Sequence, residues 1–381
     1  MKTNEISINI SGDFYSNAIS DAENYFSEEL LERFYESDFN IINLESPVTN
    51  SIKNRILKTG PYLPGSPYTF FYLKQLRTHL VTLATNHIMD YGPHGLSDTL
   101  LGCRENSINY VGAGMSLAEA KKPCVLEKNN TKIAVLNFAE NEWASASENK
   151  PGANPMNIPE NVRQIRVAKE ANDFVLVIIH GGHELYHLPS PRMVSQYRFY
   201  AENGASAIIG HHTHCISGFE IYQGIPIFYS LGNFLFTKKY DYESWYSGLI
   251  LNLKIKKHAK LEWELLAKRQ DKDTHTLTIL NGIAKQNVMD AIDQYSEIIS
   301  NQKLLMENWE YLVDQKYNYK LELFSPVNVL GNKKIRQLLR KAGLSRYFRR
   351  KMHYAEILNE LRCESHSDVL KSVITRFLEK R

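Results

Sequence analysis

The sequence predicts a layered α/β domain followed by a basic, helical extension. Short runs rich in β-branched residues alternate with helical patterns over the first half of the chain, and this alternation favours a central sheet covered by helices. From residue 219, apolar runs follow one another without intervening helices, which predicts antiparallel strands on the same body. Past about residue 284 the apolar spacing becomes helical. We therefore expect a domain over 1–270 and a helical extension over 271–381, with the boundary between 266 and 286.

Each element of the domain is predicted by its own run of residues. Strands are expected where Ile, Val, Leu and Phe are concentrated, at 5–9, 39–44, 81–84, 133–138, 174–179 and 206–210. Helices are expected between them, at 20–36, 94–106 and 191–203. The run "FEIYQGIPIFYS" predicts a hairpin with Gly224 in its turn, and "SGLILNLKI" and "KLEWELL" predict two further strands.

Composition argues against several classes of protein. The net charge of +3 is too small to indicate nucleic acid as a partner. The four cysteines form no C-x-x-C pair, which is typical of reduced, structural thiols. The first residues lack the pattern of a secretory signal peptide, and no apolar run approaches the roughly 18 residues of a membrane-spanning helix. These features predict a cytoplasmic protein.

Side chains of metal-ligand type follow five successive predicted strands. In chain order they are Asp13, Asn43 with Glu45, Asn86 with His87, His180, and His211 with His212 and His214. Because ligand sites form at the carboxyl ends of strands in open α/β sheets, we expect these side chains to meet at one edge. Carboxylate and neutral imidazole suit Mn, Zn or Fe ions, and a carboxylate can bridge two ions. The alternative for each residue is structural: a carboxylate could cap a helix, an amide could complete a turn, and the histidines could form a polar surface loop.

The order of these motifs is similar to that of one known family. The matching segments, all between about residues 5 and 250, are "SGDF", "INLESPVT", "LATNHIMDYGPHGLSDTL", "VGAGMSLAEAKKP", "VIIHGGHELY" and "IIGHHTHCISGFEIYQGIPIFYSLGNFLF". Together they resemble the CapA-like capsule-synthesis proteins, a branch of the calcineurin-like metallophosphoesterase superfamily. The resemblance implies a four-layer α/β/β/α sandwich with a centre for one or two divalent ions of Mn, Zn or Fe on one edge.

The resemblance also implies a role for each residue of this cluster. The implied metal ligands are Asp13, Glu45, Asn86, His180, His212 and His214. Glu45 would bridge two ions, with Asp13 and His214 on the first ion and the other three residues on the second. His87 would be the catalytic acid that protonates the leaving group. Many members of the superfamily have a histidine where this sequence has Tyr15, so the first ion would lack one ligand.

Four further side chains are predicted to contact the substrate: Lys58, Glu142, His183 and Arg192. Lys58 lies in a Pro- and Gly-rich loop over 54–70, a loop of the length that covers sites. Cations that face metal ions would suit a phosphorylated or polyanionic substrate. The alternative for each of these residues is an ordinary solvated position on the surface.

The extension carries a concentrated positive charge. Between residues 331 and 354 there are nine Lys or Arg and no Asp or Glu. One interpretation is a solvated helical face. The other is contact with an anionic membrane, at its inner face, or with an acidic polymer. Apolar residues of the extension such as Trp309 and Phe377 need a surface to cover, on the α/β body or on a second chain in a homodimer.

Two functions fit these motifs. The first is a metal-dependent hydrolase of the phosphoesterase type that serves the production of a capsule, a surface polysaccharide or poly-γ-glutamate. The second is a structural or regulatory partner of a polymer-synthesis complex whose metal site is vestigial. The complete set of candidate ligands favours bound metal, while Tyr15 favours weakened catalysis.

Overall fold

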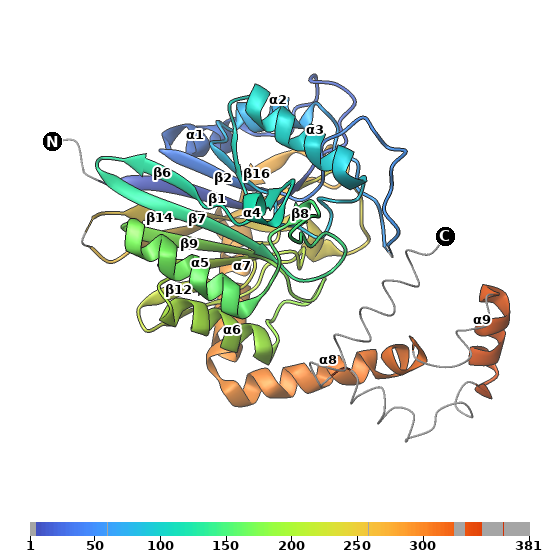
Figure 1. The fold of residues 1–381 in the computed structure, drawn as a ribbon. Helices are drawn as coiled ribbons and strands as arrows, with labels where there is room; N and C mark the ends of the chain where they lie inside the picture. The colour runs from blue at the N-terminus through green and yellow to red at the C-terminus, as the bar shows by residue number, and fades with distance from the viewer. Residues whose placement is uncertain (1–4, 59, 258, 324–331, 345–360, 362–381) are drawn as a thin grey trace. The chain divides into compact units, whose positions relative to one another are not determined.

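The computed structural model describes residues 5–58, 60–257, 259–323, 332–344 and 361. The chain divides into two compact units, Met1–Leu305 and Met306–Arg381. The first unit contains two large β-sheets with helices on their outer faces (Figure 1).

The larger sheet is parallel on one side of its first strand and antiparallel on the other. In spatial order its strands are β16 (Leu277–Ile279), β15 (Glu262–Gln270), β14 (Ser247–Ile255), β1 (Ile6–Tyr15), β2 (Phe39–Leu44), β3 (Leu80–Thr82) and β4 (Asn109–Val111). The strands from β1 to β4 are parallel, and those from β1 to β16 alternate in direction. A short strand from far along the chain, β13 (Asn233–Phe236), pairs in parallel with the end of β1.

The smaller sheet supplies the other half of the sandwich. In spatial order its strands are β11 (Phe219–Tyr222), β12 (Ile225–Phe228), β10 (Ala207–His211), β9 (Phe174–His180), β7 (Thr131–Ala139) and β6 (Cys124–Lys128). The strands β5 (Ala113–Gly114) and β8 (Gly152–Ala153) form a separate short pair. The expected hairpin is confirmed: β11 and β12 are antiparallel, and Gln223 and Gly224 at their turn both have a positive φ, as a two-residue hairpin turn requires.

Helices cover the outer face of each sheet. The bounds are α1 (Glu28–Glu36), α2 (Thr69–Gln75), α3 (Gly92–Glu105), α4 (Leu117–Ala120), α5 (Ile158–Ala171), α6 (Pro191–Glu202), the 3-10 helix η1 (Glu243–Tyr246), α7 (Gly282–Ser300), α8 (Gln302–Leu323) and α9 (Lys333–Lys341). Residues of α1, α2 and α3 pack against the larger sheet, and those of α5 and α6 pack against the smaller one.

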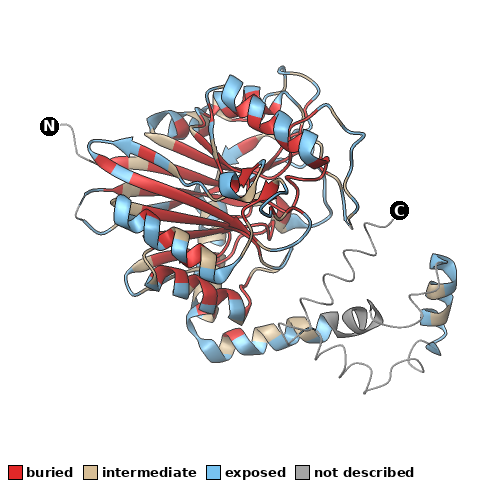
Figure 2. Cartoon of the chain, in the orientation of Figure 1, coloured by how far each residue is buried: buried red, intermediate tan, exposed pale blue. Residues whose placement is uncertain are grey.

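The alternation of side chains along the strands produces four layers. Ile41 and Ile178 belong to a buried cluster between the two sheets, while their neighbours Ile42 and Val177 belong to the clusters beneath the outer helices. Because successive side chains of a strand point to opposite faces, both sheets are covered on both sides. Figure 2 shows buried residues along the strands of both sheets. The expected α/β/β/α sandwich is confirmed.

Two sequence-based boundaries are wrong, and both errors have a tertiary cause. The helix predicted over 20–36 begins only at Glu28, because the backbone of Tyr25 and Ser27 bonds to Leu277 of β16 instead. The first unit continues to Leu305 rather than ending near 270. Helix α7 belongs to it: Ile292 is buried in the cluster between the sheets, and the backbone N–H of Phe219 donates to Ser296 Oγ at 2.9 Å.

Some expectations lie partly outside the described residues. Cys103, Cys124 and Cys215 are free thiols, while Cys363 is not described. Trp309 is half-buried, but Phe377 lies outside the described residues. Within the part of the chain that the structure describes, no helix combines the length and apolar character needed to cross a bilayer.

We expect Lys268→Met to stabilise the fold. Lys268 is fully buried in β15, its Nζ has no hydrogen-bond partner among the described residues, and burial lowers its pKa from 10.5 to about 7. The unfolded chain therefore binds more protons between these pH values, so Lys268 reduces stability progressively as pH falls from about 10.5 toward 7. The near-isosteric Met should add roughly 2–4 kcal/mol to the free energy of unfolding at neutral pH and much less at pH 10. Denaturant unfolding at both pH values measures this; an equal gain at both would contradict it.

Candidate metal centre

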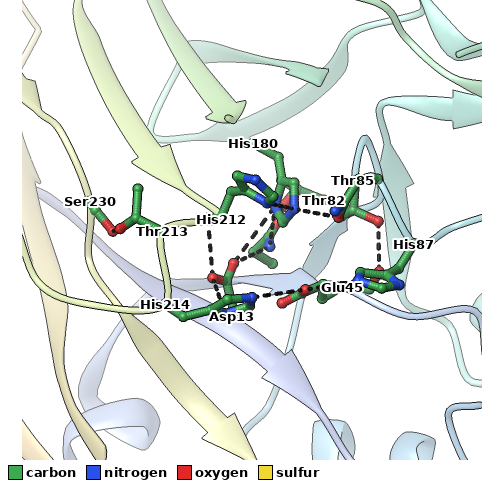
Figure 3. Close-up of polar contacts among 12 residues, drawn as sticks. Asp13, Glu45, Thr82, Thr85, His87, His180, His212, Thr213, His214 and Ser230 are labelled. Carbon is green, nitrogen blue, oxygen red and sulfur yellow. Dashed lines mark hydrogen bonds and ion pairs between the residues drawn. The ribbon is translucent and has the colours of Figure 1, made fainter. Parts of the chain in front are cut away.

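Polar side chains from both sheets meet at the carboxyl ends of the strands (Figure 3). The contributing elements are the end of β1 (Asp13), the loop after β2 (Glu45), the loop after β3 (Asn86, His87), the end of β9 (His180) and the loop after β10 (His212, His214). All of these side chains are buried. The structure thus brings together all six residues that the sequence suggested as metal ligands.

The backbone at three of these positions, Asp13, His212 and His214, is shaped for the site. Both ladders of β1, with β2 and with β13, shift register beside Asp13, and such irregularities re-aim a side chain. A Cβ on the preceding residue, Gly12, would overlap the carbonyl oxygen of Gly232, so only glycine allows β13 this close. His212 and His214 have φ values of 91° and 56°. Residues other than glycine rarely adopt such positive values, and those that do are concentrated at functional sites.

One group of ligands consists of Asp13, Glu45 and His214. One ligand atom from each lies within 4.8 Å of the others. His214 Nδ1 lies 3.4 Å from Asp13 Oδ2, and His214 Nε2 lies 3.5 Å from Glu45 Oε1. The Asn233 Oδ1 atom accepts a hydrogen bond from His214 Nδ1 at 2.9 Å, which leaves Nε2 as the ligand atom. The ring of His214 packs against Trp245, with centroids 4.6 Å apart.

A second group consists of Asn86, His180 and His212. His180 Nε2 lies 3.0 Å from Asn86 Oδ1 and 3.2 Å from His212 Nδ1. Asn43 joins the two groups, because its Nδ2 donates to Asp13 Oδ1 at 2.7 Å and lies 3.2 Å from His180 Nδ1. The two groups contain the residues that the sequence resemblance assigned to the first and the second ion, and that assignment stays a prediction.

The chemistry of the donors fits a divalent cation. Neither carboxylate oxygen of Glu45, which is fully buried, has a hydrogen-bond donor among the described residues. A buried carboxylate without hydrogen-bond donors costs roughly several kcal/mol unless a cation beside it offsets the cost. Burial lowers the pKa of His180 well below its ordinary value, so its imidazole is neutral, as a metal ligand must be. The residues present can therefore hold a metal ion, and their mix of O and N atoms suits Mn, Zn or Fe.

The carboxylates hold a proton on His214 when no cation is bound. Burial by itself lowers the pKa of His214, but the charges of Glu45 and Asp13 outweigh it and raise the pKa to about 10. Burial raises the pKa of Glu45. Burial also acts to raise the pKa of Asp13, but the hydrogen bond from His214 and the nearby histidines outweigh it, so the pKa of Asp13 is lowered. A metal ion would take the place of this proton.

We therefore expect metal binding to release about one proton per site at neutral pH. Below pH 10 the His214 imidazole must lose its proton before Nε2 can bind an ion, so the affinity should rise about tenfold per pH unit between pH 6 and 8. Calorimetric titration with Mn²⁺ in two buffers of different ionisation enthalpy counts the proton. An affinity independent of pH in this range would contradict the expectation.

His87 lies beside Glu45 of the first group but is oriented by other residues. Its Nδ1 lies 2.7 Å from Asp90 Oδ2 and 3.0 Å from Lys58 Nζ, and its Nε2 lies 3.8 Å from Glu45 Oε1. Lys58 also forms an ion pair with Asp90. The most important cause of the lowered pKa of His87 is burial. A proton on Nδ1 is thus directed to Asp90, and Nε2 is left on the side of the metal ligands.

Lys58 was predicted to contact the substrate, and the alternative was a solvated surface position, which it does not occupy. Its side chain is 2% exposed, and its charge is paired with Asp90 rather than presented to a substrate. Asp90 was not singled out from the sequence, although it lies three residues after His87 in a quoted motif. It also accepts the backbone N–H of Leu63 at 2.9 Å, so it ties the loop over 54–70 to the site.

The other three residues predicted to contact the substrate differ in their exposure and in their pairing with other side chains. Glu142 is exposed, and its Oε1 lies 3.7 Å from His212 Nε2, so it lies at the rim of the cluster. His183 is exposed on the loop after β9. Arg192 is paired with Glu140 and donates to Gln196 at 2.8 Å, which leaves less of its charge for a substrate.

Tyr15 supplies no ligand where a histidine was expected. It belongs to a buried aromatic cluster, with its ring centroid 5.0 Å from that of Phe236, and burial raises its pKa to about 12. The phenol therefore stays protonated. Asn233, which orients His214, was not singled out from the sequence. Asn43, which orients Asp13, was among the side chains of metal-ligand type but was not one of the implied ligands.

Comparison with known proteins identifies the family. The model of the family described as bacterial capsule synthesis protein PGA_cap matches residues 7–238. The chain belongs to this family. Residues 7–238 include both ligand groups, and the resemblance drawn from the sequence motifs is confirmed.

Among curated relatives, the PGA biosynthesis protein CapA of Bacillus subtilis (strain 168) is 35% identical over 208 residues, which are 54% of this chain and 55% of that protein. The capsule biosynthesis protein CapA of Bacillus anthracis is 34% identical over 210 residues, 53% of this chain and 51% of that protein. The chain thus spans about half the length of the curated relatives it matches. Among solved structures, a 5'-nucleotidase from Candida albicans covers 77% of this chain and 58% of its own at 11% identity, with a TM-score of 0.38, too low to support any inference.

Proposed function

We propose that this member of the PGA_cap family is a metal-dependent hydrolase of the phosphoesterase type. The observation that carries the proposal is the buried Asp13–Glu45–His214 group beside Asn86, His180 and His212, with both oxygens of Glu45 left without hydrogen-bond donors. The names of the two Bacillus relatives support a role in the synthesis of a capsule or of poly-γ-glutamate. A phosphorylated intermediate or precursor in the synthesis of such a polymer is the substrate class we propose.

Each ligand group would bind one cation. Asp13 and His214 would hold one ion, Asn86, His180 and His212 a second, and Glu45 both. Ions bound there would supply Lewis acidity toward the phosphoryl oxygens. Asn43 and Asn233 keep the ligands in place: Asn43 bonds to Asp13 at 2.7 Å, and Asn233 bonds to His214 at 2.9 Å. This rigid support keeps the reorganisation needed for reaction small.

In its doubly protonated form, His87 would deliver the Nε2 proton to the leaving oxygen, keep the Nδ1 proton and become neutral. Asp90 accepts the Nδ1 proton at 2.7 Å, and the Lys58 cation offsets the charge of Asp90 in this buried place. The hydrogen bond fixes the ring, so Nε2 stays beside the metal ligands. Lys58 therefore acts as a positioning residue and not as a substrate contact.

The second candidate is a structural or regulatory partner of a polymer-synthesis complex that binds metal without turnover. Tyr15 favours it, because a protonated phenol stands where a further ligand was expected. The two candidates differ in one measurable property: both retain metal, but only the hydrolase turns over substrate in proportion to the metal bound.

The test is hydrolysis of bis(p-nitrophenyl) phosphate and of γ-glutamyl peptides by the purified chain loaded with Mn²⁺ or Zn²⁺. We expect hydrolysis of the phosphodiester, its loss with a chelator, and its recovery on metal addition. His212→Gln should abolish it, whereas His94→Gln, which changes an exposed histidine on α3, should not. A metal-loaded chain that is no faster than His212→Gln on either substrate would favour the non-catalytic candidate.

A further inference from the structure

Helix α9 of the second unit separates apolar from basic residues. Ile335, Leu338, Leu339 and Ala342 follow the spacing i, i+3, i+4, i+7, so at 100° per residue they fall within an arc of about 100°. The rest of the helix is dominated by Lys333, Lys334, Arg336, Arg340 and Lys341. No Asp or Glu occurs between residues 331 and 354 to neutralise this face locally. The helix is therefore amphipathic, with a strongly cationic polar face.

The apolar face of α9 is in contact with solvent. No residue of the helix is buried, and Ile335 and Leu338 are 47% and 67% exposed. Leu344, just beyond the helix, is 43% exposed. A helix of a globular protein normally turns such a stripe toward a core. Exposure of large aliphatic side chains beside so many cations is typical of helices that lie in the interface of a membrane.

We propose that α9 docks on an anionic lipid surface. The apolar arc would enter the boundary between headgroups and acyl chains. Lys334 and Arg336, which flank that arc on either side, would reach outward to lipid phosphates with their long stems along the apolar surface. The remaining cations would lie farther round the helix, still within about a Debye length, roughly 10 Å, of the negatively charged headgroups. The proposal does not depend on the hydrolase activity.

An acidic polymer is the other polyanion that this charge would attract, and the apolar arc decides between the two. A soluble polyanion would engage the cations and leave Ile335 and Leu338 in water. An anionic bilayer would bury the apolar arc and attract the cations of the same helix. An anionic lipid surface is therefore the partner that accounts for both the apolar arc and the basic residues of α9.

The test is co-sedimentation of the full-length chain with vesicles of mixed phosphatidylcholine and phosphatidylglycerol. We expect binding at low salt, none to pure phosphatidylcholine, and a marked loss when the Debye length falls from about 10 Å to about 3 Å. Lys333→Gln with Lys334→Gln should lower the partition coefficient about 30-fold, since each basic residue near the surface contributes about 1 kcal/mol and 1.36 kcal/mol is a factor of ten. The matched control removes two exposed lysines of the first unit, Lys53→Gln with Lys74→Gln, and should leave binding unchanged.

A second variant separates lipid from polymer. Leu338→Ser keeps every charge but should weaken vesicle binding roughly tenfold or more, because a buried leucine contributes at least that much. It should leave binding to soluble poly-γ-glutamate unchanged. Vesicle binding that is equal in Leu338→Ser and the parent, or in the α9 lysine variant and its control, would overturn the proposal.

Discussion

Glu45→Gln should lower metal-dependent hydrolysis by about two to three orders of magnitude while leaving the metal-free fold at least as stable as the parent. Glu45 is a fully buried carboxylate of the first ligand group, 3.5 Å from His214 and 3.8 Å from His87, and a neutral amide is a poor substitute for it as a ligand of a divalent ion. Without metal, the buried carboxylate has no hydrogen-bond donor. Its charge helps to hold the proton on His214, 3.5 Å away, so when that charge is removed His214 can release its proton and no unpaired buried charge is left.

The measurement is a pair of thermal melts beside the rate assay. Metal at about a hundred times its dissociation constant should add about 2.7 kcal/mol to the stability of the parent and little to that of Glu45→Gln. Glu105→Gln, an exposed change on α3, controls for the loss of one negative charge. A Glu45→Gln protein that keeps the parent's rate and the parent's metal-induced stabilisation would show that Glu45 is a structural carboxylate.

His87→Ala should retain metal yet lose about 10²–10⁴ in rate on a substrate with a poor leaving group. The loss should shrink for a nitrophenol, which leaves without protonation. This dependence on the leaving group is what separates a proton donor from a group that only shapes the site. Equal losses on both substrates, or loss of metal, would remove His87 from the proposed role.

Lys58 provides a graded test of the same arrangement. Lys58→Met removes the cation that is paired with Asp90, so the ring of His87 loses part of its support and the rate should fall by less than in His87→Ala. Lys58→Arg should restore part of that loss on the poor leaving group only. A substrate-binding role would instead raise KM and leave the leaving-group dependence unchanged.

Local periodicity predicted the alternation of strands and helices, whereas the four layers and the set of metal ligands were implied by the family resemblance. Strand runs such as 39–44 and 174–179 are followed by polar residues, and parallel strands bring their ends to one edge. The supporting residues could not be found in this way. Asn233 reaches His214 only because β13 pairs in parallel with β1 across more than two hundred residues of chain, and no local pattern encodes that pairing.

The loop over 54–70 shows the same limit. Its composition predicted a covering loop, but the position of Lys58 is set by a tertiary contact with Asp90 and by the bond from Leu63 to the same carboxylate. The start of α1 was misplaced for a related reason, since the residues before Glu28 pair with β16 from the far end of the domain. Burial and charge could be assigned only once these distant segments were placed side by side.

The metal content of the purified chain, after growth in medium supplemented with Mn and Zn, tests the existence of the centre most directly. We predict about one to two transition-metal ions per chain, with His180→Ala or His212→Ala losing most of the more tightly held ion and His94→Gln losing none. A parent protein that carries no metal, and binds none when Mn²⁺ or Zn²⁺ is added, would contradict the assignment of Asp13, Glu45 and His214 as ligands.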